Sequence, residues 1–596
     1  MSVCSIKSPK FNPDKSKYIQ KYINTKVDID QSIPFGFTSS VTRNGETNIY
    51  TYGKRDIEED LPFEEDSIYR MASQSKFMGV VGFLKLVDKG AIKLDDLLKD
   101  YIPEYSKENM GVINPYKPNG YEKTLMNPIK TTKGSNHIHI QHNNHPFKVG
   151  DTISIEWANG SLGEAEFILP DANGIPGFEI FNVHVILGVD KNGYSITTST
   201  LPTKTGMTGS FLKIRSVDPG THRSIVLSPD TMMVNPKVKT HYYMLGALER
   251  DITILDVLTH GLGWAYYSPA MLYMSFGYSC DTIKRDIQAG IWNELGLPVG
   301  LPVSSYGCDI KNWARTAAKI PLLYQPAKDW SYGPQLSILG SLIEIIDGRK
   351  VENYMMEEIW DPLGMEDTGF YLHESDPNYK DKVDRMAKLY INMPKIVIKL
   401  MGSNIPFPPI YEAQNCLHEG PKNLCLVDSG MYTTPRDYLK FLKMFLNGGR
   451  TDSGQVILSP EMINTIGTYH VDYDVNNLSS VSGYSSGLSV PISGSVSDIK
   501  RQRLLTSIKW GLGVGTIQGC NNMLNPNKND KNIRAITWAG VLGTRFIIDF
   551  CSGVAYNGGT NVIGPPAGTF DSDLIELNYK EFDKEGYKRA VREMLL

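Results

Sequence analysis

Three features that mark common protein classes are missing from this 596-residue sequence. It has no run of 18 apolar residues, so it offers no candidate membrane-spanning helix. Lysine and arginine are not clustered and the formal net charge is −4, which argues against a surface for nucleic acid. The first ten residues lack the apolar segment of a secretory leader, so we expect a cytoplasmic protein without a signal peptide.

Cysteine is scarce and scattered. The seven cysteines form an odd-numbered set without a Cys-x-x-Cys pair, at positions 4, 280, 308, 416, 425, 520 and 551. This usage indicates reduced thiols, not a disulfide framework or a zinc site. Four histidines, His137, His139, His142 and His145, raise metal binding as an alternative, but no cysteine or carboxylate completes a ligand spacing. An exposed histidine-rich loop explains them more simply, so we expect no metal and no cofactor.

The most informative segment is Ser73-Gln-Ser-Lys76. An apolar repeat at helical spacing follows it and ends at Lys89-Gly90, which predicts a helix. Residues three apart share a helix face, so Ser73 and Lys76 would lie together at the first turn. The free N–H groups there would favour an oxyanion, and burial would lower the pKa of the lysine until it accepts the serine proton. Taken alone, these residues also fit a capping serine beside an ordinary lysine.

Two kinds of sequence pattern occur along the rest of the chain. Residues 34–53 predict two strands joined at Asn44-Gly45, and a capping-box spacing at Thr253 and Asp256 predicts a helix that ends near Gly261. Between these regions the helical periodicity disappears. Short alternating runs separated by Gly, Asn and Pro take its place and predict a small all-β module.

Together these segments resemble the serine β-lactamase and penicillin-binding-protein-like hydrolases, specifically the class C β-lactamase and family VIII carboxylesterase branch. The motifs follow the family's order: the 34–52 hairpin, Ala72-Ser-Gln-Ser-Lys76, the segments that begin at Ile252, Trp330 and Ser429, and Trp538-Ala-Gly-Val-Leu-Gly-Thr544. The resemblance implies an α+β protein with the β-lactamase/transpeptidase-like fold, an antiparallel sheet flanked by helices plus a helical subdomain. We expect an N-terminal extension (1–33), a hydrolase domain in two parts (34–105 and 235–565), an inserted all-β module (106–234) and a C-terminal tail with a helix (566–596).

The resemblance also implies roles for individual residues. Ser73 would be the acylated nucleophile, Lys76 its base partner, and Tyr332 would share proton transfer, its phenol pKa lowered by a neighbouring ammonium. Backbone N–H groups of Ser73 and Val541 would form the oxyanion hole. The substrate would bind along the third motif, where Gly540 permits close backbone approach, on residues Trp538, Ala539 and Gly540.

Three departures from the family pattern concern the substrate. The tyrosine motif, usually Tyr-x-Asn, is Tyr332-Gly-Pro334, and the usual His-Thr-Ser-Gly is His260-Gly-Leu-Gly263. The third motif begins with Trp538 where the family has a lysine or histidine that helps hold a substrate carboxylate. These features are similar to the esterase branch and argue against efficient hydrolysis of β-lactams. We therefore expect a small-molecule ester or amide as substrate.

Gly483-Tyr-Ser-Ser-Gly487 matches a second nucleophile pattern, Gly-x-Ser-x-Gly. A nucleophile elbow needs a strand before the serine and a helix after it, and this segment lies in a Ser/Gly-rich stretch. We therefore do not expect Ser485 to act as a nucleophile.

The β module loosely resembles modules of phage-tail and giant-virus proteins, through the segment that begins at His145 and a Gly-Ile-Pro-Gly motif. The chain is also rich in Asn, Lys, Ile and Tyr, which suits an AT-rich genome and favours a large DNA virus as its source. The protein would then act in the host cytoplasm or be packaged in the virion. The alternative function is a catalytically weak or inactive structural protein whose β module mediates protein binding or self-association.

Overall fold

The computed structural model describes residues 13–29, 33–116, 120–157, 183–198, 201–202, 205–208, 211–217, 223–227, 239–266, 282–295, 297, 309–391, 424–470, 509–518, 533–550 and 553–563. The predicted C-terminal helix and Ser485 lie outside these residues.

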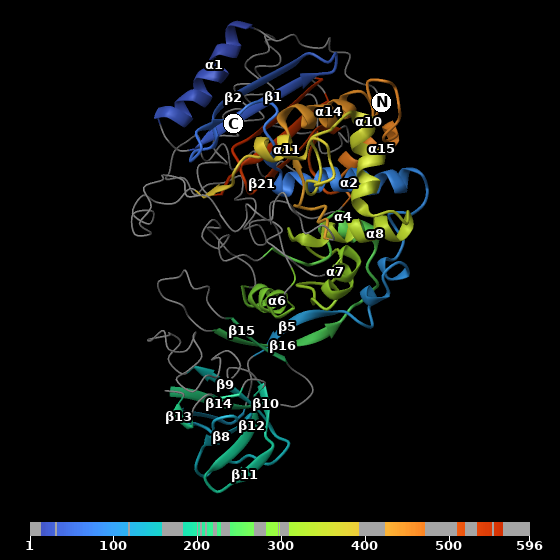
Figure 1. Ribbon diagram of the computed structural model, residues 1–596. Coiled ribbons are helices and arrows are strands. Elements are labelled where there is room, and N and C mark those ends of the chain that lie inside the picture. Colours follow the sequence, from blue (N-terminus) through green and yellow to red (C-terminus); the bar gives the residue numbers. More distant parts are fainter. Residues whose placement is uncertain are drawn as a thin grey trace, which may run out of the picture.

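An antiparallel sheet of eight strands forms the upper half of the molecule in Figure 1, in the order β19-β20-β21-β22-β23-β1-β2-β3. Strand β1 pairs with β23, so segments from near the two ends of the described chain meet in the middle of the sheet. The turn predicted at Asn44-Gly45 joins β1 to β2, and Gly45 has a φ of 87° that suits glycine. The strands are β1 (Phe35–Thr42), β2 (Thr47–Asp56), β3 (Leu61–Pro62), β19 (Lys509–Trp510), β20 (Gly515–Gln518), β21 (Ile533–Gly540), β22 (Thr544–Asp549) and β23 (Val554–Gly559).

Helices cover both faces of this sheet. The apolar side of α1 (Pro13–Asn24), formed by Ile19 and Ile23, packs against tyrosines of β2. On the other side, α2 (Ser75–Asp88) is buried along most of its length and packs against the phenylalanines of α14 (Pro435–Leu446) through Phe77. Asp88, at its end, accepts hydrogen bonds from Ser459, the N-cap of α15 (Pro460–Gly467). Phe77 of α2 stacks on Phe546 of β22, with ring centroids 5.2 Å apart. The predicted helix end at Lys89-Gly90 is confirmed, because Lys89 is the C-cap and Gly90 has a positive φ.

A helical region lies below the sheet in Figure 1 and contacts α2 through α8. Its helices are α4 (Ile254–Leu258), α6 (Thr282–Glu294), α7 (Ile310–Ala317), the 3₁₀ turn η6 (Pro334–Ser337) and α8 (Ile338–Ile346). The chain continues through α9 (Val351–Met355) and the π turn η7 (Met356–Trp360) to α10 (Asp361–Leu363) and α11 (Tyr379–Arg385), which are in the upper half of Figure 1. The predicted capping box of α4 is present, with Thr253 and Asp256 bonded reciprocally. The predicted helix end at Gly261 is displaced, because the residue with positive φ there is His260.

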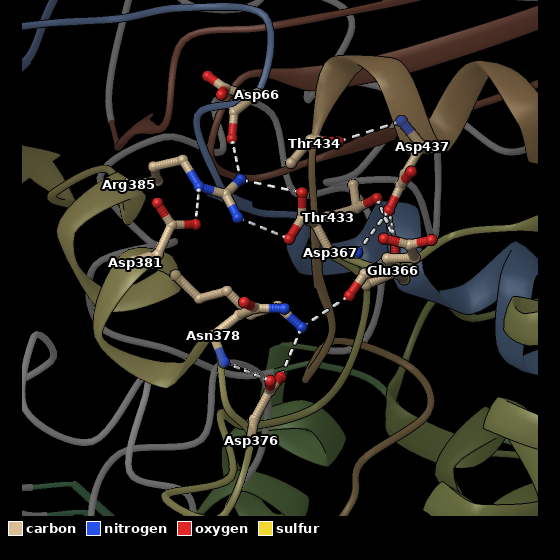
Figure 2. Close-up of polar contacts among 12 residues, drawn as sticks. Asp66, Glu366, Asp367, Asp376, Asn378, Asp381, Arg385, Thr433, Thr434 and Asp437 are labelled. Atoms are coloured by element: carbon tan, nitrogen blue, oxygen red, sulfur yellow. Dashed lines mark hydrogen bonds and ion pairs between the residues drawn. The ribbon is translucent and has the colours of Figure 1, made fainter.

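An ion-pair network anchors α11 next to the segment that leads to Ser73 (Figure 2). Arg385 donates to both carboxylate oxygens of Asp367, at 2.8 and 2.9 Å, and to Asp381 at 2.8 Å. It also donates to the carbonyl oxygen of Asp66, three residues before strand β4 (Tyr69–Arg70), at 2.7 Å. Asp437 of α14 accepts a hydrogen bond from the N–H of Asp367 at 2.8 Å. The network therefore joins α11, α14 and the approach to the serine.

The predicted β module is at the bottom of Figure 1 and has its own hydrophobic core. That core is built from isoleucines, Leu212, Phe147 and Tyr194, all between residues 129 and 214. Two sheets enclose it, in the orders β10-β9-β14-β6 and β11-β12-β8-β7-β13. Their strands are β6 (Glu122–Met126), β7 (Ile129–Thr131), β8 (His137–Gln141), β9 (Thr152–Trp157), β10 (Val183–Val185), β11 (Gly188–Asp190), β12 (Gly193–Thr197), β13 (Gly206–Thr208) and β14 (Phe211–Val217).

A third, smaller sheet connects this module to the helical region. It consists of β15 (Arg223–Leu227), β16 (Lys239–Ala247) and β5 (Gly111–Tyr116), with β16 in the middle. All three strands contact α6, and Val112 and Ile113 are buried in the main core together with Tyr243. The small sheet thus belongs to the main core, whereas the separate core of the β module begins farther along the chain, at Ile129.

Candidate active site

Ser73 lies in a short 3₁₀ turn, η2 (Ala72–Gln74), directly before α2. The turn follows β4, which pairs with β18 (Tyr432–Thr433). The prediction placed Ser73 in the first turn of the helix itself, whereas α2 begins two residues after Ser73, at Ser75. Ala72 takes a φ of 48°, a left-handed conformation that is uncommon outside glycine and is often found at functional sites. The Ser73 side chain is largely buried, with 8% of the residue exposed.

Lys76 is fully buried and its ammonium nitrogen lies 3.3 Å from Ser73 Oγ. It donates to Tyr266 Oη at 2.8 Å and to the carbonyl oxygen of Asp428 at 2.9 Å. Burial lowers the pKa of Lys76, while the negative charge of Asp428 works in the opposite direction. The predicted proximity of Ser73 and Lys76 and the lowered lysine pKa are both confirmed.

Tyr332 reaches the same place from the segment before η6. It is hydrogen-bonded to Ser73, and its hydroxyl accepts a hydrogen bond from Trp538 Nε1 at 2.9 Å. The prediction of a lowered phenol pKa is wrong: burial raises the pKa of Tyr332 above its usual value. The Lys76 ammonium lies over the face of the ring, 5.0 Å from its centroid. Desolvation of the phenolate is nevertheless the largest effect on the pKa of Tyr332.

The third motif ends strand β21 beside the serine turn. A Cβ on Gly540 would lie 2.6 Å from the carbonyl oxygen of Met71 and 3.2 Å from the backbone nitrogen of Ser73. Thr544 Oγ1 donates to the same Met71 oxygen at 2.8 Å. Gly540 is therefore required by the chain's own backbone, in addition to the predicted approach of substrate. Val541 follows it directly, which puts both expected oxyanion donors on adjoining segments.

Aromatic rings surround the hydroxyl of Tyr332. Trp510 lies edge-on to Trp538, with centroids 4.5 Å apart, and Trp330 packs against Trp510 at 5.3 Å. Behind them is His260, which is fully buried and whose Nδ1 faces the Gln335 amide at 2.5 Å. Burial, aided by the charge of Lys76, lowers the pKa of His260 well below its usual value. These rings make the wall beside Ser73 apolar and uncharged.

Two residues next to Lys76, Tyr266 and Asp428, were not predicted as site residues from the sequence. Asp428 is 1% exposed and forms an ion pair with Lys76, with Oδ2 3.3 Å from Nζ. A single carboxylate after the apolar run Leu424-Cys-Leu-Val427 is a signal that could have indicated a buried, paired charge. Tyr266 lies in an irregular segment of a tyrosine-rich chain, where no pattern distinguishes it.

Within the described ranges, no group of three or more His, Cys, Asp or Glu side chains is arranged to hold a metal ion. His142 is buried between Tyr121 and Tyr194, which lie 2.9 and 3.2 Å from its ring nitrogens, and burial lowers its pKa to about 4. Cys425 is buried and unbridged, and the other six cysteines lie outside the described residues. None of the described helices is both long and apolar enough to cross a bilayer.

Residues 31–124 and 229–471 match the family model named Beta-lactamase. The matched residues make up more than half of the chain, and they include Ser73, Lys76 and Tyr332. The chain therefore belongs to the β-lactamase family, and its fold is the β-lactamase/transpeptidase-like fold implied by the sequence motifs. The unmatched stretch between the two segments contains most of the separate β core.

Three similar proteins put this result in context. Protein Rv1367c of Mycobacterium tuberculosis is 30% identical over 222 residues, which cover 37% of this chain and 44% of that protein. Esterase EstB of Burkholderia gladioli is 26% identical over 125 residues, 21% of this chain and 27% of EstB. The chain thus spans less than half the length of these curated relatives. The solved structure of simvastatin synthase (LovD) from Aspergillus terreus has a TM-score of 0.54 at 14% identity, covering 94% of this chain and 97% of LovD.

Proposed function

We propose that this β-lactamase-family protein is a serine hydrolase that acts through an acyl-enzyme on Ser73. One observation carries the proposal: Ser73 Oγ is 3.3 Å from the buried Lys76 nitrogen and is hydrogen-bonded to Tyr332. A nucleophile within reach of a desolvated amine and a phenol is the arrangement that acyl transfer requires. Ser73 would attack the substrate carbonyl, and its proton would pass to Lys76.

The remaining roles follow from geometry and protonation. The N–H groups of Ser73 and Val541 would hold the oxyanion of the tetrahedral intermediate. Because its pKa is raised, Tyr332 stays a neutral phenol and suits the role of proton donor to the leaving alkoxide. Tyr332 would regain that proton from Lys76, and a water molecule would then release the acyl group from Ser73.

The apolar wall favours uncharged esters or amides over β-lactams. Trp538 stands where a substrate carboxylate would need a cation, and its N–H group is already engaged by Tyr332. A carboxylate placed there would lose hydration without gaining a charged partner, which costs several kcal/mol or more. The esterase activity named for EstB is consistent with this substrate class.

Labelling with a fluorophosphonate probe, followed by peptide mapping, tests the proposal. We expect one adduct on Ser73, none in Ser73→Ala and a strongly slowed reaction in Lys76→Ala. Thermal unfolding of each variant serves as the control for folding. A folded wild-type chain that takes no label would refute the catalytic function.

In that case the second candidate is a binding or structural role for the β module. Several of its apolar side chains are exposed, including Met126 at 68%, Val149 at 61% and Leu201 at 54%. Surfaces of this kind suit association with a protein or with a second copy of the chain. A place in a virus particle belongs to this alternative. It predicts that the chain is not a monomer in sedimentation experiments, whether or not Ser73 reacts.

A further inference from the structure

Asp428 lies in a segment that packs closely against α2, the helix that follows Ser73. A Cβ on Gly79, three residues after Lys76, would lie 2.6 Å from Val427 Cβ and 2.7 Å from Val427 O. Only a residue without a side chain allows the neighbouring backbone this close to α2. On the other side, Ser75 Oγ accepts a hydrogen bond from the N–H of Met431 at 3.2 Å. The position of the Asp428 carboxylate is therefore fixed by the packing of this segment on α2.

Both oxygens of this carboxylate are fully used. Oδ1 accepts from the hydroxyls of Ser337 and Ser429, the latter at 3.0 Å. Oδ2 accepts from the hydroxyl of Tyr266 and from the Lys76 ammonium, which lies 3.3 Å away. Four donors therefore surround this buried carboxylate and fix it next to the amine of Lys76.

The protons of the Lys76 ammonium are also all engaged in hydrogen bonds. Its nitrogen has four acceptors within 3.3 Å: the carbonyl and Oδ2 of Asp428, Tyr266 Oη and Ser73 Oγ. An ammonium group has three protons to share among them and no lone pair to accept another. The other groups facing Lys76 are the ring of Tyr332, 5.0 Å away, and His260, which burial keeps neutral. Asp428 is the anionic group among these neighbours.

We propose that Asp428 is a positioning residue that holds Lys76 as an ammonium in the resting protein, so that Lys76 becomes the base for Ser73 only after this proton leaves. The inference rests on the proposed hydrolase function. It differs from a site in which desolvation alone keeps the lysine neutral. In this chain burial and the Asp428 charge oppose each other, and the carboxylate raises the pH at which the serine becomes reactive above the value that burial alone would give.

The departing proton has a route to solvent. Lys76, Asp428 and Ser337 are buried, whereas Tyr266 is partly exposed and bonded to both members of the ion pair. Tyr266 would turn its hydroxyl from Asp428 Oδ2 to a water molecule, release that proton to the water, and take the proton of Lys76 on its oxygen. This leaves a neutral amine, a neutral phenol and an unchanged carboxylate. The neutral amine can then take the proton of Ser73 as the serine attacks.

The test is the pH dependence of fluorophosphonate labelling at Ser73 in the full chain. An opposite charge within about 4–6 Å typically changes a pKa by one to three units. In Asp428→Asn we therefore expect the acid limb of the labelling rate to move down by about one pH unit or more, because the charge that retains the proton is gone. Ser337→Ala is the matched control: it removes a hydrogen bond to the same carboxylate and keeps the charge, so its acid limb should stay at the wild-type pH.

The outcomes separate the two proposals. Labelling of Ser73 in Asp428→Asn with an unmoved acid limb, or one moved to higher pH, would overturn the role of Asp428 and leave the hydrolase function intact. Absence of any wild-type labelling would refute the hydrolase function instead. If thermal unfolding shows that Asp428→Asn is unfolded, the smaller neutral variant Asp428→Ser carries the same test. A slower rate with an unmoved limb in both neutral variants would mean that Asp428 has a structural role only.

Discussion

The indole N–H of Trp538 donates a hydrogen bond to the hydroxyl of Tyr332 over 2.9 Å. One residue of the third motif therefore replaces the family's cation and at the same time orients the phenol that faces Ser73. In the proposed reaction, a change at Trp538 would therefore alter both the wall of the site and the position of the proposed proton donor, Tyr332.

Trp538→Phe should lower the labelling rate of Ser73 about fivefold, since one neutral hydrogen bond contributes about 1 kcal/mol. Trp510→Phe is the matched control. Trp510 belongs to the same aromatic cluster, but its Nε1 has no hydrogen-bond partner in the part of the chain that the structure describes. If both variants slow the reaction equally, the aromatic packing matters and the hydrogen bond to Tyr332 does not.

Short-chain p-nitrophenyl esters should be hydrolysed with a higher kcat/KM than nitrocefin. The expected ratio reflects the missing cation at position 538, and Trp538→Lys should shift it toward nitrocefin. The measurement is the ratio of the two kcat/KM values in each protein, so that a general loss of activity cancels. A wild-type ratio in favour of nitrocefin would contradict this expectation and would require a carboxylate-binding residue other than the one at position 538.

His260 predicts a pH dependence of stability. Its pKa is lowered well below the usual value in the fold, where Nε2 has no partner among the described residues. Below about pH 6.5 the unfolded chain binds a proton that the folded chain does not, so stability falls as the pH falls, by up to about 1.4 kcal/mol per unit. His260→Asn, which tolerates the positive φ, should show a shallower decline between pH 6.5 and 5 in urea unfolding. Parallel curves for the two proteins would contradict this assignment.

The sequence predicted the elements around Ser73 well, because each has a local signal. Helix α2, the hairpin at Gly45 and the capping box at Thr253 follow from periodicity and turn chemistry. The order of the motifs identified the family, which the family model confirms. The expected roles of Tyr332, Val541 and the substrate-binding strand remain predictions.

The contacts between segments far apart in the sequence could not be predicted. Asp428 and Lys76 are 352 residues apart in the sequence, and their ion pair depends on the close packing of Val427 on Gly79. The direction of the Tyr332 pKa was wrong because the sequence suggested a charged neighbour but not the burial that outweighs it. Long-range packing of this kind leaves no periodic trace in a single sequence.

Gly540→Ala should slow labelling of Ser73 at least tenfold. The added methyl group would meet the carbonyl oxygen of Met71 at 2.6 Å, and that backbone cannot move without displacing the serine turn. Gly188→Ala in the β module is the control, because the nearest atom to its added methyl group is 4.0 Å away. If Gly540→Ala reacts at the wild-type rate, β21 and the turn η2 separate more easily than their packing indicates.

The last prediction concerns deletion of the β module. The boundaries of the deletion follow from the small sheet β5-β16-β15. Tyr116, the last residue of β5, pairs with Tyr242, and Arg223, the first of β15, pairs with Tyr243. The two ends lie on opposite sides of β16, so they are two strand spacings apart, about 10 Å. A linker of about five Gly/Ser residues spans that distance. Replacing residues 118–221 should therefore leave a soluble protein that is still labelled at Ser73.

The wider deletion of residues 106–230 is the informative comparison. It removes β5 and β15, including Val112 and Ile113, which are buried in the main core. Exposing those side chains and leaving β16 unpaired should cause aggregation or loss of labelling. Size-exclusion chromatography and labelling of both deletions measure the difference. If both deletions leave a soluble protein that is labelled at Ser73, the small sheet is not part of the hydrolase body. If the narrow deletion also fails, the module is needed to assemble the site around Ser73, and its separate core does not make it an independent insertion.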